Sequence, residues 1–227
     1  MSARIAAGID PENLKESLYV PSALFLKQIN HRLPIKKLPA SLVYAGSLNK
    51  ENGPDLVIHA FKKVLKTIAQ AKLHIITDGQ DIETQSLRDL TDELGIHDKV
   101  LFHGLIPSQY ELINDLKQFM VGLAPYRAIP GSPRWWADAT RIRLYLAAGL
   151  PVITTNVPPI AKELEQEKSG LVVKDNAQQF AQAIVSLLKN KTLYRKMRQN
   201  AIIQARNNTW DKVYSKTLKS MRVEFSS

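Results

Sequence analysis

Short apolar segments alternate with amphipathic segments from residue 41 onward, and this alternation restricts the fold more than any other feature. Each apolar segment is three to five residues long and has Gly, Pro or Asp at one of its ends. Such segments are typical of strands that a parallel sheet buries on both faces. We expect strands at residues 42–45, 73–77, 100–103, 120–124, 152–155 and 171–173.

Helical patterns fill the intervals between these strands. Val57, Phe61 and Val64 share one helix face, and Pro54 suits the first turn before them. The alternation of strand and helix predicts an α/β fold with a doubly wound parallel sheet, in which ligands bind beyond the carboxyl ends of the strands. Further helices are expected at 82–94, 109–118, 140–148, 160–166 and 177–188, the last capped by Asp175 or Asn176.

The two ends of the chain follow other patterns. After Lys189 the sequence is helical throughout, and we expect residues 208–225 to form a helix whose apolar stripe packs along the flank of the sheet. Prolines interrupt residues 1–40, which we interpret as a linker and entry segment. Residues 41–227 then form the domain itself.

Composition excludes several classes of protein. The chain has no cysteine, so it can form neither a disulfide framework nor a thiolate site. Its five histidines do not have metal-ligand spacing, and no metal is expected. The sequence shows no signal peptide and no run of the roughly 20 apolar residues that span a bilayer. We expect a soluble, cytoplasmic protein.

The net charge of +10 is concentrated at the carboxyl end, where residues 189–227 hold ten Lys or Arg against Asp211 and Glu224. Such a segment could contact an anionic membrane, which would place the protein at the inner membrane face, or a nucleic acid or an acidic partner. A solvated helix face is the alternative. No nucleic-acid-binding motif is present, so we expect no nucleic acid as partner.

Residues 138–155 form the most specific local pattern. Asp138 or Thr140 can cap a helix start, Gly149 suits its end, and a buried strand follows Pro151. The amino terminus of a helix that lies at a strand edge can bind an anion.

This segment resembles [D/S]P[T/L]K-x-x-EYLAAG-x-PVI, the donor-binding segment of retaining GT-B glycosyltransferases of group 1, or family 4. The resemblance extends over about residues 4–221 and implies one Rossmann-like half of a GT-B fold, followed by carboxyl-terminal helices. That half binds a nucleotide-diphosphate sugar, which is the substrate in these enzymes, without a metal or other cofactor.

The resemblance also assigns site residues in three loops. Residues 46–55 are similar to the family's G-R-L-x-x-x-K-G-x-D loop, whose two cations hold the diphosphate. The positions of these two cations fall on Ser47 and Asn52, and Lys50 is nearby. Gly46 lets the backbone approach a ligand. Gly79 matches a turn under the sugar nucleotide. Leu105 and Ile106 correspond to the residues whose main chain contacts the nucleotide base in the family.

The fourth loop departs from the family pattern. The glutamate that grips the ribose falls on Leu144, and an earlier carboxylate falls on Trp136, with Asp138 the nearest acid. Arg134, Arg141 and Arg143 could replace the lost charges, because guanidinium groups bind phosphate in bidentate fashion. Trp135 and Trp136 could stack on a ligand or pack in the core.

The resemblance implies the donor-binding half of a retaining hexosyltransferase of polysaccharide biosynthesis, with a divergent donor site. It assigns no catalytic residue. The family's amino-terminal acceptor domain is missing, so a separate domain or subunit is the expected partner, and the isolated chain is expected to be inactive. A non-catalytic, degenerate glycosyltransferase-like subunit for binding or assembly is the alternative.

Overall fold

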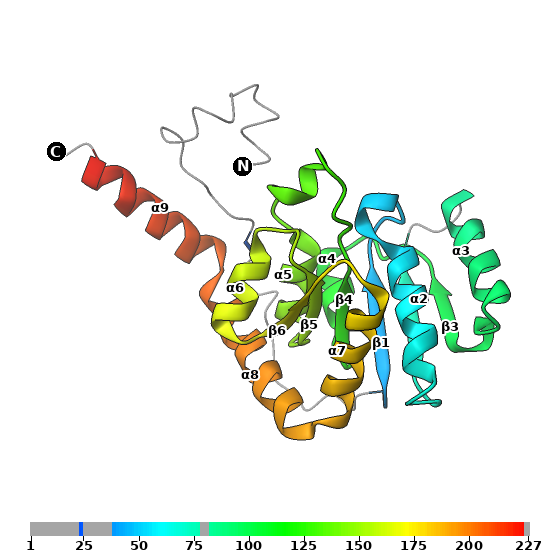
Figure 1. Ribbon diagram of the computed structural model, residues 1–227. Coiled ribbons are helices and arrows are strands. Elements are labelled where there is room, and N and C mark those ends of the chain that lie inside the picture. The colour runs from blue at the N-terminus through cyan, green and yellow to red at the C-terminus, as the bar shows by residue number, and fades with distance from the viewer. Residues whose placement is uncertain (1–22, 25–37, 78–81, 225–227) are drawn as a thin grey trace.

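One parallel sheet organises the structure, a computed structural model that describes residues 23–24, 38–77 and 82–224, with side chains up to Lys219. Its six strands lie in the order β3-β2-β1-β4-β5-β6, which confirms the predicted doubly wound sheet (Figure 1). The strands are β1 (Ser41–Ala45), β2 (Lys72–Ile76), β3 (Val100–His103), β4 (Val121–Ala124), β5 (Val152–Thr155) and β6 (Gly170–Val173).

The helices occupy the predicted intervals, with ends that shift by one or two residues. Pro54 opens its helix as expected, and Asn176 rather than Asp175 caps another by accepting from the backbone N–H groups of Gln178 and Gln179. The α-helices are α2 (Pro54–Leu65), α3 (Ile82–Glu93), α4 (Gln109–Leu116), α5 (Thr140–Ala147), α6 (Ile160–Glu167), α7 (Ala177–Lys189), α8 (Lys191–Asn207) and α9 (Trp210–Glu224). Short 3₁₀ turns are η3 (Lys50–Asn52), η4 (His97–Lys99) and η5 (Pro133–Trp135).

Helices cover both faces of the sheet and enclose two apolar clusters. One cluster contains side chains of α2, α3 and α7, and the other contains side chains of α4, α5 and α6. Helix α8 contributes Met197 to the first cluster and Ala201 to the second. Because the four inner strands are buried on both faces, their continuous apolar runs in the sequence are accounted for.

The strand order reverses between β1 and β4, and the two strands separate toward their carboxyl ends. Their Cα pairing consists of Leu42 with Val121 and Val43 with Gly122. Beyond it, the backbone N–H of Ala45 donates to the hydroxyl of Tyr145 on α5 over 2.7 Å, and this hydroxyl donates to the carbonyl of Leu123 over 3.2 Å. Tyr145 therefore holds α5 at the point where an open sheet binds its ligands.

The predicted packing of the last helix, α9, along the flank of the sheet is wrong. Residues 210–224 are helical as expected, but the helix extends away from the sheet rather than along its flank (Figure 1). Its apolar side chains Tyr214 and Leu218 are 54% and 59% exposed. The reason is that other helices already cover both sheet faces. The start of α9 is attached to Leu24, whose carbonyl accepts from the N–H of Trp210.

Most of the predicted entry segment, residues 1–22 and 25–37, lies outside the described residues. None of the helices that the structure describes combines the length and the apolar character needed to cross a bilayer.

A histidine pair joins β2 to β3. Nδ1 of His74 lies 2.9 Å from Nε2 of His103, and the ring of Phe119 packs on His74 with 4.7 Å between ring centroids. Burial, together with the nearby charges of His103 and Lys72, lowers the pKa of His74 to about 4. His74 is therefore neutral in the folded protein at neutral pH.

This pair predicts a loss of stability in acid. Between pH 6.5 and 4 the unfolded chain protonates His74 while the folded protein does not, so the free energy of unfolding falls as the pH falls, by up to about 3 kcal/mol. In His74→Gln the change in unfolding free energy between pH 7 and pH 4.5, measured by urea denaturation, should be smaller than in the parent. His97→Gln, which replaces an exposed histidine outside this pair, is the control. Equal pH dependence in both variants would contradict the assignment.

Candidate functional site

A cavity of about 340 Å³ lies at the carboxyl ends of β1 and β4, beneath the start of α5. It brings together ten of the twelve residues that the sequence proposes as site residues. These are Gly46, Ser47, Asn52, Leu105, Ile106, Arg134, Asp138, Thr140, Arg141 and Leu144. Lys50 lies on η3 and is exposed, and it is not among the lining residues. Gly79 lies outside the described residues.

Arg141, in the first turn of α5, is the central cation of the cavity. Its guanidinium lies over the ring of Tyr44 at 4.4 Å and over that of Tyr126 at 5.6 Å. Gly46 makes this position possible, because a Cβ there would lie 2.5 Å from Nη2 of Arg141. Aromatic faces attract a guanidinium, so the two tyrosines orient Arg141 while leaving its charge without a counterion.

The charge of Arg141 is not neutralised within the described part of the chain. No carboxylate there lies within ion-pair distance of it, and its Nη1 is buried without a hydrogen-bond partner. Burial by itself disfavours the charged form, but the hydroxyls of Tyr44, Tyr126 and Tyr145 raise the pKa of Arg141 above its usual value. A buried cation of this kind, with a free donor, is suited to bind an anion.

A second guanidinium lies near the first. Nε of Arg134 on η5 is buried without a hydrogen-bond partner and is 3.9 Å from a carboxylate oxygen of Glu51. The guanidinium lies 5.8 Å from the ring of Tyr126, the same ring that contacts Arg141. The cavity therefore has a cationic side formed by the β4–α5 loop and the first turn of α5.

The prediction that Asp138 or Thr140 caps α5 is wrong. The N-cap of α5 is Ala139, and no side chain caps this helix. Both carboxylate oxygens of Asp138 instead accept from Arg143, each over 3.0 Å, and Arg143 also reaches Glu163 on α6 at 3.4 Å. Arg143 is 2% exposed, so this guanidinium supports the loop from within and is not a cavity residue.

The loop after β1 is stabilised internally. The side-chain amide of Asn52 donates to the carbonyl of Ser47 over 3.2 Å and to its Oγ over 2.7 Å, and the hydroxyl of Tyr44 donates to the same carbonyl over 2.6 Å. Gly53 has the left-handed backbone conformation, with φ of 62°, that begins α2. Ser47 and Asn52 therefore shape the wall of the cavity through contacts with each other.

Apolar side chains line the rest of the cavity. Leu105 and Ile106 follow β3, Leu112 lies on α4, and Leu144 lies on α5 one turn after Arg141. Leu144 is 8% exposed and belongs to the cluster against which Ile106 and Leu112 pack. The cavity thus combines two cations near β4 with an apolar wall formed by side chains of α5, of α4 and of the loop after β3.

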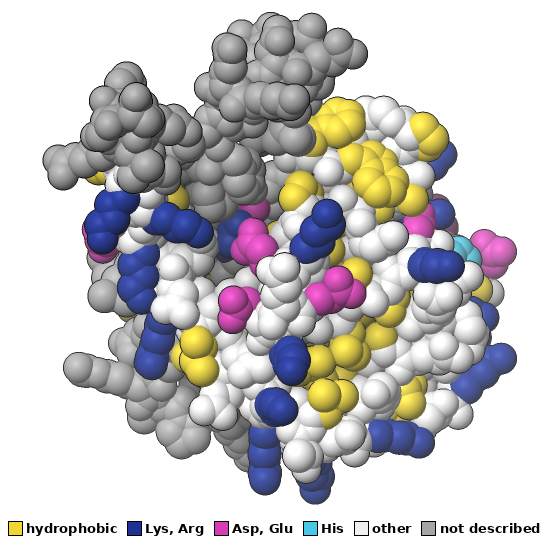
Figure 2. Space-filling model, turned by 60° about the vertical axis from the view of Figure 1, so that its left-hand side comes forward, with side chains coloured by type: hydrophobic (Ala, Val, Ile, Leu, Met, Phe, Trp, Pro, Cys, Tyr) yellow, Lys and Arg dark blue, Asp and Glu magenta, His cyan; other side chains and the backbone are white. Residues whose placement is uncertain are grey.

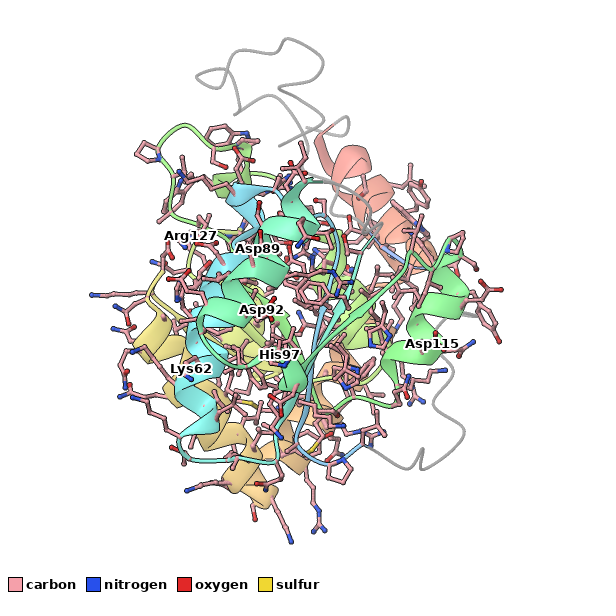
Figure 3. The ribbon with its side chains drawn as sticks, turned by 90° about the vertical axis from the view of Figure 1, so that its right-hand side faces the viewer. Lys62, Asp89, Asp92, His97, Asp115 and Arg127 are labelled. Carbon is pink, nitrogen blue, oxygen red and sulfur yellow. The ribbon has the colours of Figure 1, made fainter. Side chains whose placement is uncertain are left out.

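Sequence reasoning missed Arg127, which holds the loop that carries Arg134. Its guanidinium donates to Asp55 at the start of α2 over 2.7 Å and to Asp175 before α7 over 3.1 Å. The backbone N–H of Arg127 donates to the carbonyl of Glu51. Figure 3 labels Arg127 beneath this loop. Its position directly after β4 was the available signal, because residues at strand ends lie at the ligand edge. Trp135 and Trp136 follow on this loop, and neither lines the cavity.

The Arg143 ion pairs predict a stability effect that surface pairs do not share. Arg143→Met should lower the free energy of unfolding by about 3–5 kcal/mol, because the Asp138 side chain, 7% exposed, would remain charged without its partner. Lys99→Met removes the exposed ion pair with Asp98 and should change the free energy of unfolding by less than about 1 kcal/mol. Urea denaturation measures both. Similar losses in the two variants would show that Arg143 is not a buried support.

Comparisons with known proteins identify the fold with a family of enzymes. The family model described as glycosyl transferases group 1 matches residues 39–190. YtcC of Bacillus subtilis, whose name marks it as an inferred glycosyltransferase, is 29% identical over 168 residues, which are 70% of this chain and 39% of that protein. The lipopolysaccharide 1,6-galactosyltransferase of Salmonella typhimurium is 25% identical over 152 residues, 67% of this chain and 39% of its own length.

A solved structure has the same fold. WaaG, a glycosyltransferase involved in lipopolysaccharide biosynthesis, superposes with a TM-score of 0.69 at 20% identity, covering 89% of this chain and 54% of WaaG. The chain spans about two fifths of the length of the curated relatives that it matches.

Proposed function

Because this chain belongs to the glycosyl transferases group 1 family, we propose that it is the donor-binding half of a retaining glycosyltransferase. It would bind a nucleotide-diphosphate sugar at the β1–β4 cavity and present the hexose for transfer. The single observation that carries this proposal is the charge of Arg141, which no described carboxylate compensates, at the place where an open α/β sheet binds its ligands.

The cationic side of the cavity suits a diphosphate. Arg141 and Arg134 supply fixed positive charges, and the first turn of α5, which no side chain caps, supplies backbone N–H groups and the positive end of a helix dipole. As the sugar leaves, negative charge grows on the diphosphate, and donors already in place stabilise it without reorganisation. In this proposal the guanidinium groups take the role that a metal has elsewhere, so no metal or other cofactor is required.

Transfer also needs an acceptor site. The curated relatives are more than twice as long as the segment they share with this chain. We therefore propose that an amino-terminal domain or a partner subunit supplies the acceptor site, and that the 227 residues alone do not catalyse transfer. The reaction would belong to the biosynthesis of a polysaccharide.

A non-catalytic subunit is the second candidate. Ser47 and Asn52 bond each other where the family has cations, and Leu144 replaces the ribose glutamate, so three contacts to a donor are changed. A domain that kept the fold and lost the site would act in binding or assembly. The two candidates differ in whether nucleoside diphosphates bind at the cavity.

Substitution of Arg141 tests the first candidate. Arg141→Ala should weaken binding of uridine or guanosine diphosphate at least tenfold, since a hydrogen bond to a charged group contributes about 1.5–3 kcal/mol. Calorimetric titration gives the affinities, and Arg195→Ala, which removes an exposed cation of α8, should leave them unchanged. Equal weakening in both variants would indicate unspecific charge attraction. Absence of binding to the parent protein at millimolar nucleotide would favour the non-catalytic candidate.

We also propose that α8 and α9 contact an anionic membrane at its cytoplasmic face. Helix α8 carries five Lys or Arg and no acidic residue. Figure 2 turns this side of the molecule toward the viewer and shows Lys and Arg side chains along its margin. Each basic side chain near an anionic bilayer contributes about 1 kcal/mol of attraction.

Vesicle sedimentation tests this contact. The protein should bind vesicles that contain phosphatidylserine and should be released by salt, because screening weakens the attraction. The double variant Arg195→Glu, Lys196→Glu should bind more weakly than the matched variant Lys66→Glu, Lys72→Glu, which changes as much charge at the end of α2 and the start of β2, outside α8 and α9. Equal binding of the two variants would contradict a role for α8.

A further inference from the structure

The two sides of the cavity suit different parts of a nucleoside diphosphate. Arg134 and Arg141 lie at the β4 side, and Leu105 and Ile106 lie at the loop after β3, two strands away from β1. A diphosphate held by the two guanidinium groups would leave the carboxyl ends of β1 and β2 to its nucleoside, because Ala45, Ile76 and Thr77 line the cavity there. The ribose and the base then face the apolar wall that includes Leu144.

The described lining of the cavity offers no uncommitted carboxylate to a ribose. Among the described residues that line it, Asp138 is the one acid, and both of its oxygens accept from Arg143. A ribose that carries a 2′-hydroxyl and a 3′-hydroxyl is gripped best by a carboxylate that accepts from both. Here that group would first have to leave a buried ion pair, which is costly.

The other polar side chains of the described lining lie in the loop after β1, at the end of β2 or, like Tyr126, at the cationic side. Ser47 and Asn52 bond each other, and Thr77 has an interaction of its own. Thr140 is exposed and adjoins Arg141, at the diphosphate side. A 2′-hydroxyl buried against Leu144 would lose its hydrogen bonds to water, and the leucine side chain offers none in return, so this loss is unfavourable.

We propose that the donor of this site is the sugar ester of a 2′-deoxyribonucleoside diphosphate. The inference rests on the proposed function, because it assumes that a nucleoside diphosphate binds in the cavity. A 2′-deoxyribose presents a methylene group where ribose presents a hydroxyl, and a methylene group is what an apolar wall accommodates without loss. The apolar residue at position 144 then determines the class of donor that the site accepts.

Two matched pairs of ligands test the proposal on the unmodified protein. Uridine diphosphate and its 2′-deoxy counterpart differ by one hydroxyl, as do guanosine diphosphate and its counterpart. For the base that binds, the 2′-deoxy ligand should bind more tightly than the ribonucleotide or within about threefold of it, since one net hydrogen bond is worth about 2- to 12-fold. A ribonucleotide that binds more than about threefold more tightly would overturn the inference and leave the proposed function standing. If none of the four ligands binds, both fall.

Leu144→Glu tests the position of the ribose. The variant should shift the ratio of ribonucleotide to 2′-deoxyribonucleotide affinity toward the ribonucleotide by at least about fivefold, while Leu144→Met should leave the ratio as in the parent. The ratio is the readout because a carboxylate one turn from Arg141 could pair with it and weaken both ligands alike. An unchanged ratio in a variant that circular dichroism shows to be folded would overturn the placement of the ribose. If Leu144→Glu does not fold, Leu144→Gln provides the same comparison with a neutral hydrogen-bonding group.

Discussion

The hydroxyl of Tyr145 is the contact on which the site depends. It bonds the N–H of Ala45 and the carbonyl of Leu123, and so takes the place of ladder partners where β1 and β4 separate. The ring needs Gly122 beneath it, because a Cβ there would lie 2.5 Å from the aromatic carbon Cγ. Helix α5 is thereby fixed to two strands, and its first turn is directed at the open edge of the sheet.

The position of Arg141 follows from that of α5. One helical turn before Tyr145, its guanidinium lies against Gly46 and over Tyr44, so residues from β1, from the loop after it and from α5 form one unit. Arg143, on another side of the same helix, ties Asp138 and Glu163 together and holds the loop from within. Two arginines two residues apart thus have different tasks: Arg143 supports the fold, and Arg141 keeps its charge for a ligand.

The fold could be predicted from the sequence because its signals are local. The apolar runs, Pro54 at a helix start and Asn176 at another depend on a few neighbouring residues each. The packing of α9 could not be predicted, because an apolar stripe does not tell whether the sheet face it would cover is already occupied. Asp138 has the sequence of a helix cap, but its bond to the buried Arg143 takes its carboxylate away from the backbone N–H groups.

The family motifs gave the candidate residues a common location in the fold, but the contacts among these residues were not predicted. Family motifs brought ten of twelve candidates to one cavity, since motifs mark strand ends. The stacking of Arg141 on Tyr44 joins residues 97 positions apart, which no local pattern reveals.

A crystal structure of the protein soaked with a nucleoside diphosphate tests the account most directly. The account predicts diphosphate oxygens within about 3 Å of the guanidinium of Arg141 and the first turn of α5. A diphosphate bound outside the cavity, for example on the basic surface of α8, with Arg141 unchanged, would contradict it.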